Sequence, residues 1–135
     1  MFKKEIDFRE DTRPVGLIDE CYRQLNEELF NGCLPEDLPV IYNNRLKRTL
    51  GKAYFRYEVD KTMTPVRIEI QRKHSWTDRF LRKVLTHEMC HVWAYTVHGE
   101  VGHGPMFWKM MRSVGYPQGH EWPGAPSNER DTYSD

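Results

Sequence analysis

The residues with the clearest chemical potential are His87, Glu88 and His91, which form an H-E-x-x-H motif. In an α-helix four residues advance about 400°, so both histidines project from one face and can bind the same zinc ion at about 2.1 Å. Glu88 is displaced from that face, which suits a general base that reaches a water molecule rather than the metal. If the segment is helical, the motif predicts a zinc centre with Glu88 as the catalytic base.

A catalytic zinc needs three protein ligands and one open position, so a third ligand must come from outside the motif. If the helix continues, His98 lies seven residues beyond His91 and about 10.5 Å along the axis, too far to share an ion. His103 lies between Gly102 and Gly104, which let the chain turn back toward the helix, and we predict it as the third ligand. The remaining candidates are Glu100, His120 and Glu121.

The chemistry that follows is hydrolysis of a peptide bond. Zinc lowers the pKa of its water toward about 7 and polarises the carbonyl, while Glu88 takes the proton and returns it to the leaving amine. A second donor to the developing oxyanion would help. The candidates are Tyr95, His98, Tyr116 and His120, and the sequence does not choose among them.

The elements that position these residues can be predicted from hydrophobic periodicity. Apolar residues recur at helical spacing from Val15 to Phe30, and Asn31-Gly32 supplies a left-handed stop. Three short β-like runs follow, and turn-prone residues separate them. These runs are 40–42, 51–57 and 66–70.

The motif itself falls in a long helix that a Ser75-x-x-Asp78 capping box opens and that Gly99 ends. Apolar residues lie on more than one of its faces, so we expect this helix to be central. Pro105 suits the first position of a last helix, which Gly115 ends. The predicted fold class is α+β, with a small antiparallel or mixed sheet of about three strands packed with three helices.

Composition indicates one soluble domain. The chain has 135 residues, of which 39% are hydrophobic and 30% charged, and it contains no run near the ~20 apolar residues of a membrane span. The first ten residues do not resemble a secretion signal, so we expect a cytoplasmic monomer, nucleoid-associated in a bacterium or nuclear in a eukaryote. Cys21, Cys33 and Cys90 have no paired C-x-x-C spacing, and we expect buried thiols rather than disulfides or a cysteine-ligated zinc.

The net charge of zero hides an uneven distribution. Residues 41–83 carry 12 basic and 4 acidic side chains, whereas both flanking segments are acidic. The basic segment 45–83 therefore predicts a surface for single-stranded or damaged DNA, and the alternative is a solvated face held by salt bridges. Aromatic residues in this segment could stack on unpaired bases or belong to the core. They are Tyr54, Phe55, Tyr57 and Trp76.

Three motifs in order resemble the SprT-like domain family, which includes the Spartan-type proteases of DNA–protein crosslink repair. The motifs are Leu25-Asn26-x-x-Leu29-Phe30-Asn31-Gly32-x-Leu34-Pro35, Leu85-Thr86-His87-Glu88-Met89-Cys90-His91-Val92 and Gly102-His103-Gly104-Pro105-Met106-Phe107. The resemblance implies a zincin-like metallopeptidase domain over residues 15–116, between an N-terminal extension (1–14) and a Pro/Gly-rich tail (117–135).

By this resemblance, His87, His91 and His103 bind zinc, Glu88 is the base and the substrates are proteins associated with DNA. The cysteine-ligated ribbon that follows the domain in many relatives has no counterpart in these 135 residues. Two alternatives remain open. One is a general zinc peptidase without a nucleic-acid role, and the other is a non-enzymatic DNA-binding module with a structural zinc.

Overall fold

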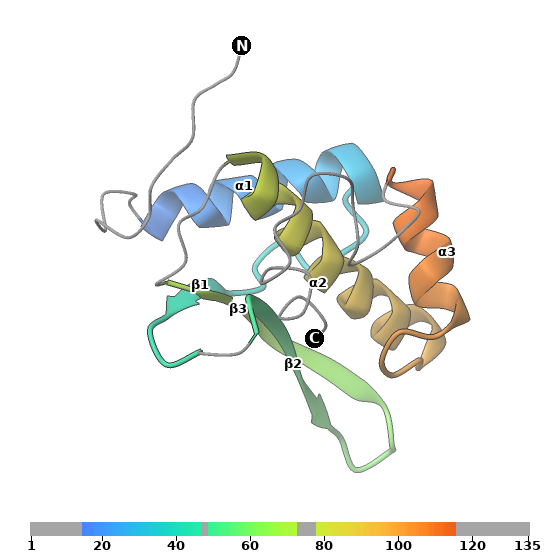
Figure 1. Cartoon of the computed structure of the whole chain (residues 1–135). Helices are drawn as coiled ribbons and strands as arrows, with labels where there is room; N and C mark the ends of the chain where they lie inside the picture. The colour runs from blue at the N-terminus through green and yellow to red at the C-terminus, as the bar shows by residue number, and fades with distance from the viewer. Residues whose placement is uncertain (1–14, 47–48, 73–77, 116–135) are drawn as a thin grey trace.

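The computed structural model describes residues 15–46, 49–72 and 78–115 of the chain. Its elements run in the order α1 (Val15–Phe30), β1 (Val40–Asn43), β2 (Gly51–Tyr57), β3 (Met63–Gln71), α2 (Asp78–His98) and α3 (Pro105–Ser113) (Figure 1). The predicted α+β class, with three helices and a three-stranded sheet, is confirmed. The predicted capping-box residue Ser75, Trp76 and the segments 1–14 and 117–135 lie outside the described residues.

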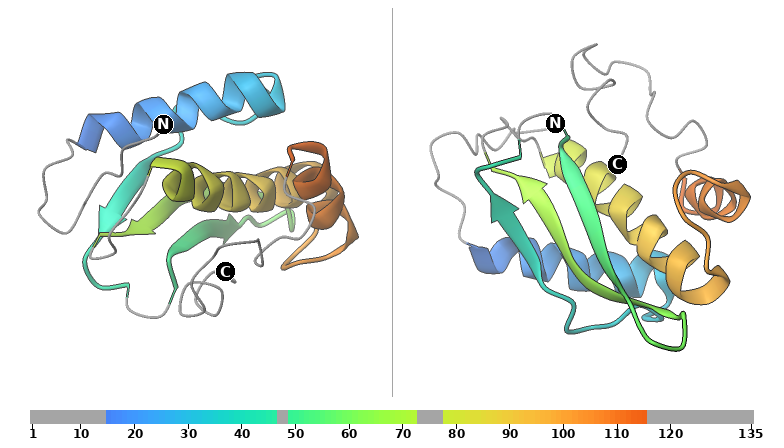
Figure 2. Two further views of the ribbon diagram at one scale, coloured as in Figure 1. Left: turned by 45° about the horizontal axis from the view of Figure 1, so that its top comes forward. Right: turned by 90° about the horizontal axis from the view of Figure 1, so that it is seen from below.

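The sheet is mixed, with the strand order β1-β3-β2. β1 pairs with β3 in parallel, in the register Val40 to Ile68, and β2 pairs with β3 antiparallel, with a bulge between Tyr54 and Phe55. α1 and α2 lie on the same face of this sheet (Figure 2). α3 packs against α2, at the side of the molecule away from β1 (Figure 1).

The third strand begins three residues earlier than the predicted Val66, because Met63 to Pro65 also join the ladder. Proline is tolerated in a strand where one edge has no neighbour to receive its missing N–H bond. Pro65 lies in such a place, since β1 pairs only with residues from Ile68 onward. The extension makes a long β2–β3 hairpin, and Asp60 Oδ1 accepts hydrogen bonds from the backbone N and hydroxyl of Thr62 in its turn.

α2 is central, as its pattern predicted. Leu81, Val84, Leu85 and Met89 are fully buried in the main apolar cluster, which also contains Ile68 from β3. At about 25 cal/mol per Å² of apolar surface, burial of such side chains stabilises the fold by roughly 1.5–3 kcal/mol each. No helix in the described part of the chain is long and apolar enough to cross a membrane.

Two polar side chains of α1 hold the loop that leads to β1. The amide of Asn26 donates to Leu34 O at 3.0 Å and accepts from Leu34 N at 3.1 Å, so one buried side chain replaces two backbone partners. Tyr22 Oη donates to Pro35 O at 2.5 Å, and burial, with Asp37 and Cys33 nearby, raises the pKa of Tyr22 above its ordinary range. These contacts give a physical reason for the Leu25 to Pro35 motif.

One cysteine prediction is wrong. Cys21 and Cys90 are buried, but Cys33 is exposed. It follows the left-handed pair Asn31 and Gly32, where the chain leaves α1 on its outer side. The turn rather than the apolar character of the thiol therefore decides its exposure.

Candidate metal centre

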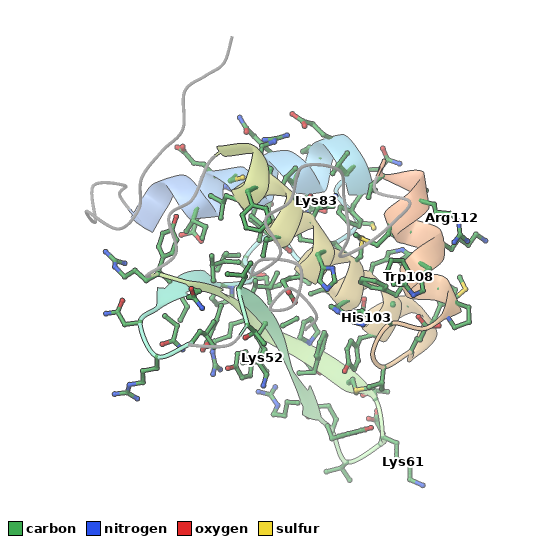
Figure 3. The ribbon with its side chains drawn as sticks, viewed as in Figure 1. Lys52, Lys61, Lys83, His103, Trp108 and Arg112 are labelled. Atoms are coloured by element: carbon green, nitrogen blue, oxygen red, sulfur yellow. The ribbon has the colours of Figure 1, made fainter. Side chains whose placement is uncertain are left out.

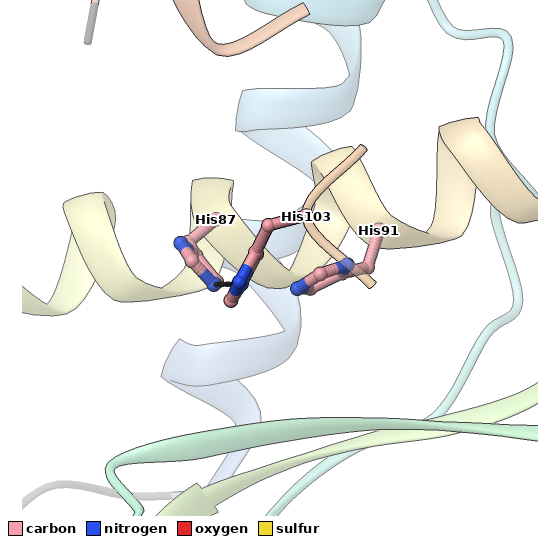
Figure 4. A group of neighbouring side chains, drawn as sticks. All are labelled: His87, His91 and His103. Carbon is pink, nitrogen blue, oxygen red and sulfur yellow. Dashed lines mark hydrogen bonds between the residues drawn. The ribbon is translucent and has the colours of Figure 1, made fainter. Parts of the chain in front are cut away.

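His87 and His91 lie one turn apart on α2, and His103 reaches them from the loop between α2 and α3 (Figure 4). One ligand atom from each histidine lies within 4.8 Å of the others. His103 Nε2 is 3.3 Å from His87 Nε2. His87 and His91 are buried and His103 is half-buried, so the group has a protein side and a more open side.

The separation of His87 and His103 fits two ligands of a tetrahedral metal ion. With metal–nitrogen bonds of about 2.0–2.1 Å, two nitrogens of a tetrahedral site are about 3.3 Å apart, which matches the separation of His87 and His103. Three neutral imidazoles are also a donor set found in catalytic zinc sites. The three histidines are therefore positioned to bind a metal ion, and their chemistry is consistent with zinc.

Glu88 follows the first histidine and is 1% exposed. The start of β2 makes room for its side chain, because a Cβ atom on Gly51 would lie only 3.1 Å from Glu88 Cγ and Oε2. On the same turn, burial and the nearby Glu88 raise the pKa of the Cys90 thiol above its ordinary range. Cys90 is therefore a neutral thiol.

Comparison with known families gives a match to the SprT-like family over residues 18–131. The chain belongs to the SprT-like family. Membership indicates a domain of the zinc-metallopeptidase type, in agreement with the resemblance of the three motifs.

Among curated proteins, this SprT-like chain is similar to the germ cell nuclear acidic protein of Drosophila melanogaster, with 32% identity over 94 residues. The aligned part is 70% of this chain but 9% of that protein. No solved structure matches the chain.

Of the other ligand candidates, two lie within the described residues, and neither joins the three histidines. His98 is exposed at the end of α2, with its ring 4.8 Å from that of Trp93. Glu100 instead accepts hydrogen bonds from the backbone N of Met106 and Phe107. His120, Glu121 and the oxyanion candidate Tyr116 lie outside the described residues.

Phe107 is a site residue that the sequence indicated only as the last residue of the third motif. Its fully buried ring lies 4.4 Å from the ring centroid of His91, 4.8 Å from that of His103 and 4.9 Å from that of His87. One aromatic ring thus supports all three imidazoles. The available signal was its place at the end of the third motif, four residues after His103.

The sheet face turned away from α1 and α2 carries charged and aromatic side chains of the basic segment. Strand alternation puts Lys52 and Tyr54 on this face, because Gly51 and Ala53 face the helices. Lys52 Nζ lies 5.4 Å and Arg67 Cζ 4.1 Å from the centre of the Tyr54 ring. Figure 3 places Lys52 on β2 and Lys61 at the far end of the β2–β3 hairpin.

An acidic residue is buried beneath these cations. Glu69, 4% exposed, accepts hydrogen bonds from Arg67 Nε at 2.6 Å and Asn43 Nδ2 at 2.7 Å. Burial disfavours its charged form, but the bonds from Arg67, Asn43 and Tyr54 outweigh that effect and lower the pKa of Glu69. Arg67 is therefore engaged within the protein.

Proposed function

We propose that this chain is a zinc-dependent endopeptidase that cleaves proteins bound or crosslinked to DNA. The observation that carries the peptidase part is the convergence of His87, His91 and His103 beside the buried Glu88. A zinc ion held by these imidazoles would supply the positive charge that polarises a peptide carbonyl and makes a water molecule more acidic.

The chain's own groups perform the remaining steps. Glu88 accepts a proton from the attacking water and later donates it to the leaving amine. A purely structural metal site needs ligands but no such base, so Glu88 favours catalysis over the non-enzymatic alternative. Tyr95 lies one turn beyond His91 on the same face of α2, stacked on Phe55 with ring centroids 3.5 Å apart, and is the described residue best placed to donate to the oxyanion.

The DNA part of the proposal is supported by the basic segment. Lys52 and Lys61 belong to the β2–β3 hairpin, and Tyr54 adds an aromatic ring to the same face. Phosphate contacts by such side chains give affinity that falls steeply with salt. The Drosophila relative is named as a nuclear protein, which is compatible with a location beside DNA.

The decisive experiment compares the wild type with Glu88→Gln and His103→Ala. Metal content is measured by mass spectrometry, and cleavage of a DNA-binding protein is followed with and without single-stranded DNA. We expect about one zinc per chain in the wild type and in Glu88→Gln, with cleavage only in the wild type. His103→Ala should lose most of the zinc, because two imidazoles remain.

The role of the sheet face is tested in the same assay. Lys52→Ala/Lys61→Ala should reduce stimulation by DNA, whereas Lys109→Ala, an exposed cation on α3, is the matched control. If the cleavage rate changes neither with DNA nor with the Lys52 and Lys61 substitutions, the result would favour a general zinc peptidase. Zinc without any cleavage would leave the binding module, and absence of zinc would refute the metal centre itself.

A further inference from the structure

The loop that carries His103 is tied to both helices by one residue, Glu100, through its backbone to α2 and through its side chain to α3. Glu100 N donates to Ala94 O of α2 at 3.0 Å. The Glu100 carboxylate accepts from Met106 N at 2.9 Å through one oxygen and from Phe107 N at 2.7 Å through the other. His103 lies between these two attachment points.

The two bonds satisfy donors that the helix cannot satisfy. The first N–H groups of a helix have no partner within it, and a side chain at the N-cap position usually accepts one of them. The N-cap of α3 is Gly104, which has no side chain, and no N-cap side-chain bond is formed there. Glu100 therefore serves as the cap from four residues upstream, with a negative charge at the positive end of the helix.

Gly104 leaves the room for this arrangement. A Cβ atom there would lie 2.6 Å from Glu100 Cδ and 2.7 Å from Glu100 Oε2, closer than real contacts allow. The φ of Gly104 is −87°, which any residue adopts, so the requirement is for space rather than for a left-handed conformation. Gly104, beside His103, thus leaves the space that the Glu100 carboxylate occupies when it caps α3.

The Glu100 cap affects both Phe107, which lies against the histidines, and His103, which comes from the loop. Phe107, whose N–H it holds, presents its ring to all three imidazoles. His103, the ligand that does not come from α2, depends on the loop path between Gly99 and Gly104. Gly99 and Gly102 have φ values of 66° and 74°, so the loop contains two residues in the left-handed backbone conformation. The cap holds the end of this loop in place.

We propose that Glu100 is a positioning residue for the metal centre: its carboxylate clamps the first turn of α3 and thereby holds His103 and Phe107 against the α2 histidines. This inference rests on the proposed function, because it assumes that the three histidines bind metal. The same arrangement argues against Glu100 as the third metal ligand, since both of its carboxylate oxygens accept hydrogen bonds from backbone N–H groups.

The test measures zinc affinity, by competition with a chromophoric chelator, for the wild type, Glu100→Gln, Glu100→Ala and Gly104→Ala. Loss of an outer-shell partner typically weakens metal binding about 10- to 100-fold, so we expect Glu100→Ala to fall by about 10-fold or more. Glu100→Gln, which keeps one acceptor oxygen, should be intermediate. Asp60→Asn, which alters a carboxylate that caps the β2–β3 turn, is the matched control and should leave affinity unchanged.

Two double variants separate positioning from general stability. In the His103→Ala background, Glu100→Ala should weaken zinc binding much less than in the wild type, because only the contact through Phe107 remains. In the Glu100→Ala background, Gly104→Ala should add no further loss, because the carboxylate that the methyl group would meet is absent. Thermal unfolding with a chelator present confirms that each variant folds without metal, and Glu100→Gln serves if Glu100→Ala does not fold.

The outcomes are distinct. If the wild type binds zinc and Glu100→Ala binds it equally well, the clamp is refuted while the proposed function stands. The same conclusion follows if Glu100→Ala loses only metal-free stability, or if its effect on affinity is undiminished without His103. If the wild type binds no zinc, the proposed function itself fails.

Discussion

Gly51, the first residue of β2, leaves the space beside the Glu88 carboxylate, and filling that space tests the role of Glu88. A Cβ atom at position 51 would lie 3.1 Å from Glu88 Cγ and Oε2 and 3.0 Å from Val84 Cγ1. Non-bonded carbon atoms are best separated by about 3.5–4.0 Å, so the added methyl group must displace these neighbours by roughly 0.5–1 Å.

The displacement should harm catalysis more than metal binding. Glu88 is 1% exposed, so its carboxylate has no space in solvent to move into. Misplacement of a catalytic group by about 1 Å can cost about 100-fold in rate, and overpacking a core costs about 1–3 kcal/mol of stability. We therefore expect Gly51→Ala to lower kcat by about 10- to 100-fold, with zinc affinity unchanged because the nearest atoms belong to Val84 and Glu88.

The assay combines cleavage of an unfolded protein substrate with zinc competition, for Gly51→Ala and for Gly51→Ala/Val84→Ala. The double variant removes the contact with Val84 but keeps the contact with Glu88. We expect the double variant to relieve the overpacking at Val84 but to keep the lowered kcat. A wild-type rate in Gly51→Ala, or full recovery of kcat in the double variant, would contradict the idea that Gly51 sets the position of Glu88.

Three further predictions concern stability. Asn26→Ala leaves the buried N–H and C=O of Leu34 unpaired, so the free energy of unfolding in urea should fall by about 2–4 kcal/mol, against less than about 0.5 kcal/mol for the exposed Gln24→Ala. The lowered pKa of Glu69 means that its contribution is present above its ordinary value of 4.5 and is lost as the pH falls. In Glu69→Gln, Tm should therefore fall less steeply as the pH is lowered. A decrease of Tm in acid equal to that of the wild type would argue against this contribution of Glu69. Thr86 has a fully buried hydroxyl that finds no hydrogen-bond partner among the described residues, so Thr86→Val should keep or raise Tm, whereas a clear loss would mean that the hydroxyl is bonded.

Local patterns were enough to predict much of the site. The spacing of His87 and His91 places both on one helical face, because four residues make slightly more than one turn. The stop at Asn31-Gly32 and the start at Pro105 depend on single-residue φ preferences, and the structure has both where they were predicted. Such features follow from residues close together in sequence and need no knowledge of the rest of the chain.

Pairing of distant elements could not be predicted in this way. β3 lies between β1 and β2, parallel to one and antiparallel to the other, and each strand has a similar pattern of apolar residues. The start of β3 at Met63 rather than Val66 depends on β1 being too short to reach Pro65. Strand order and register therefore depend on contacts between segments that are far apart in the sequence.

The features of the metal centre also fall into those that follow from local sequence and those that depend on the tertiary structure. The sequence by itself determined that His87, Glu88 and His91 share a helix and that a flexible glycine loop with a histidine follows it. Only the tertiary structure decided that His103 meets the α2 histidines, that Glu100 caps α3 and that Phe107 lies against all three imidazoles. A carboxylate near a metal centre suits a ligand or a helix cap equally well by type, and the choice depends on which donors the folded loop brings within 3 Å.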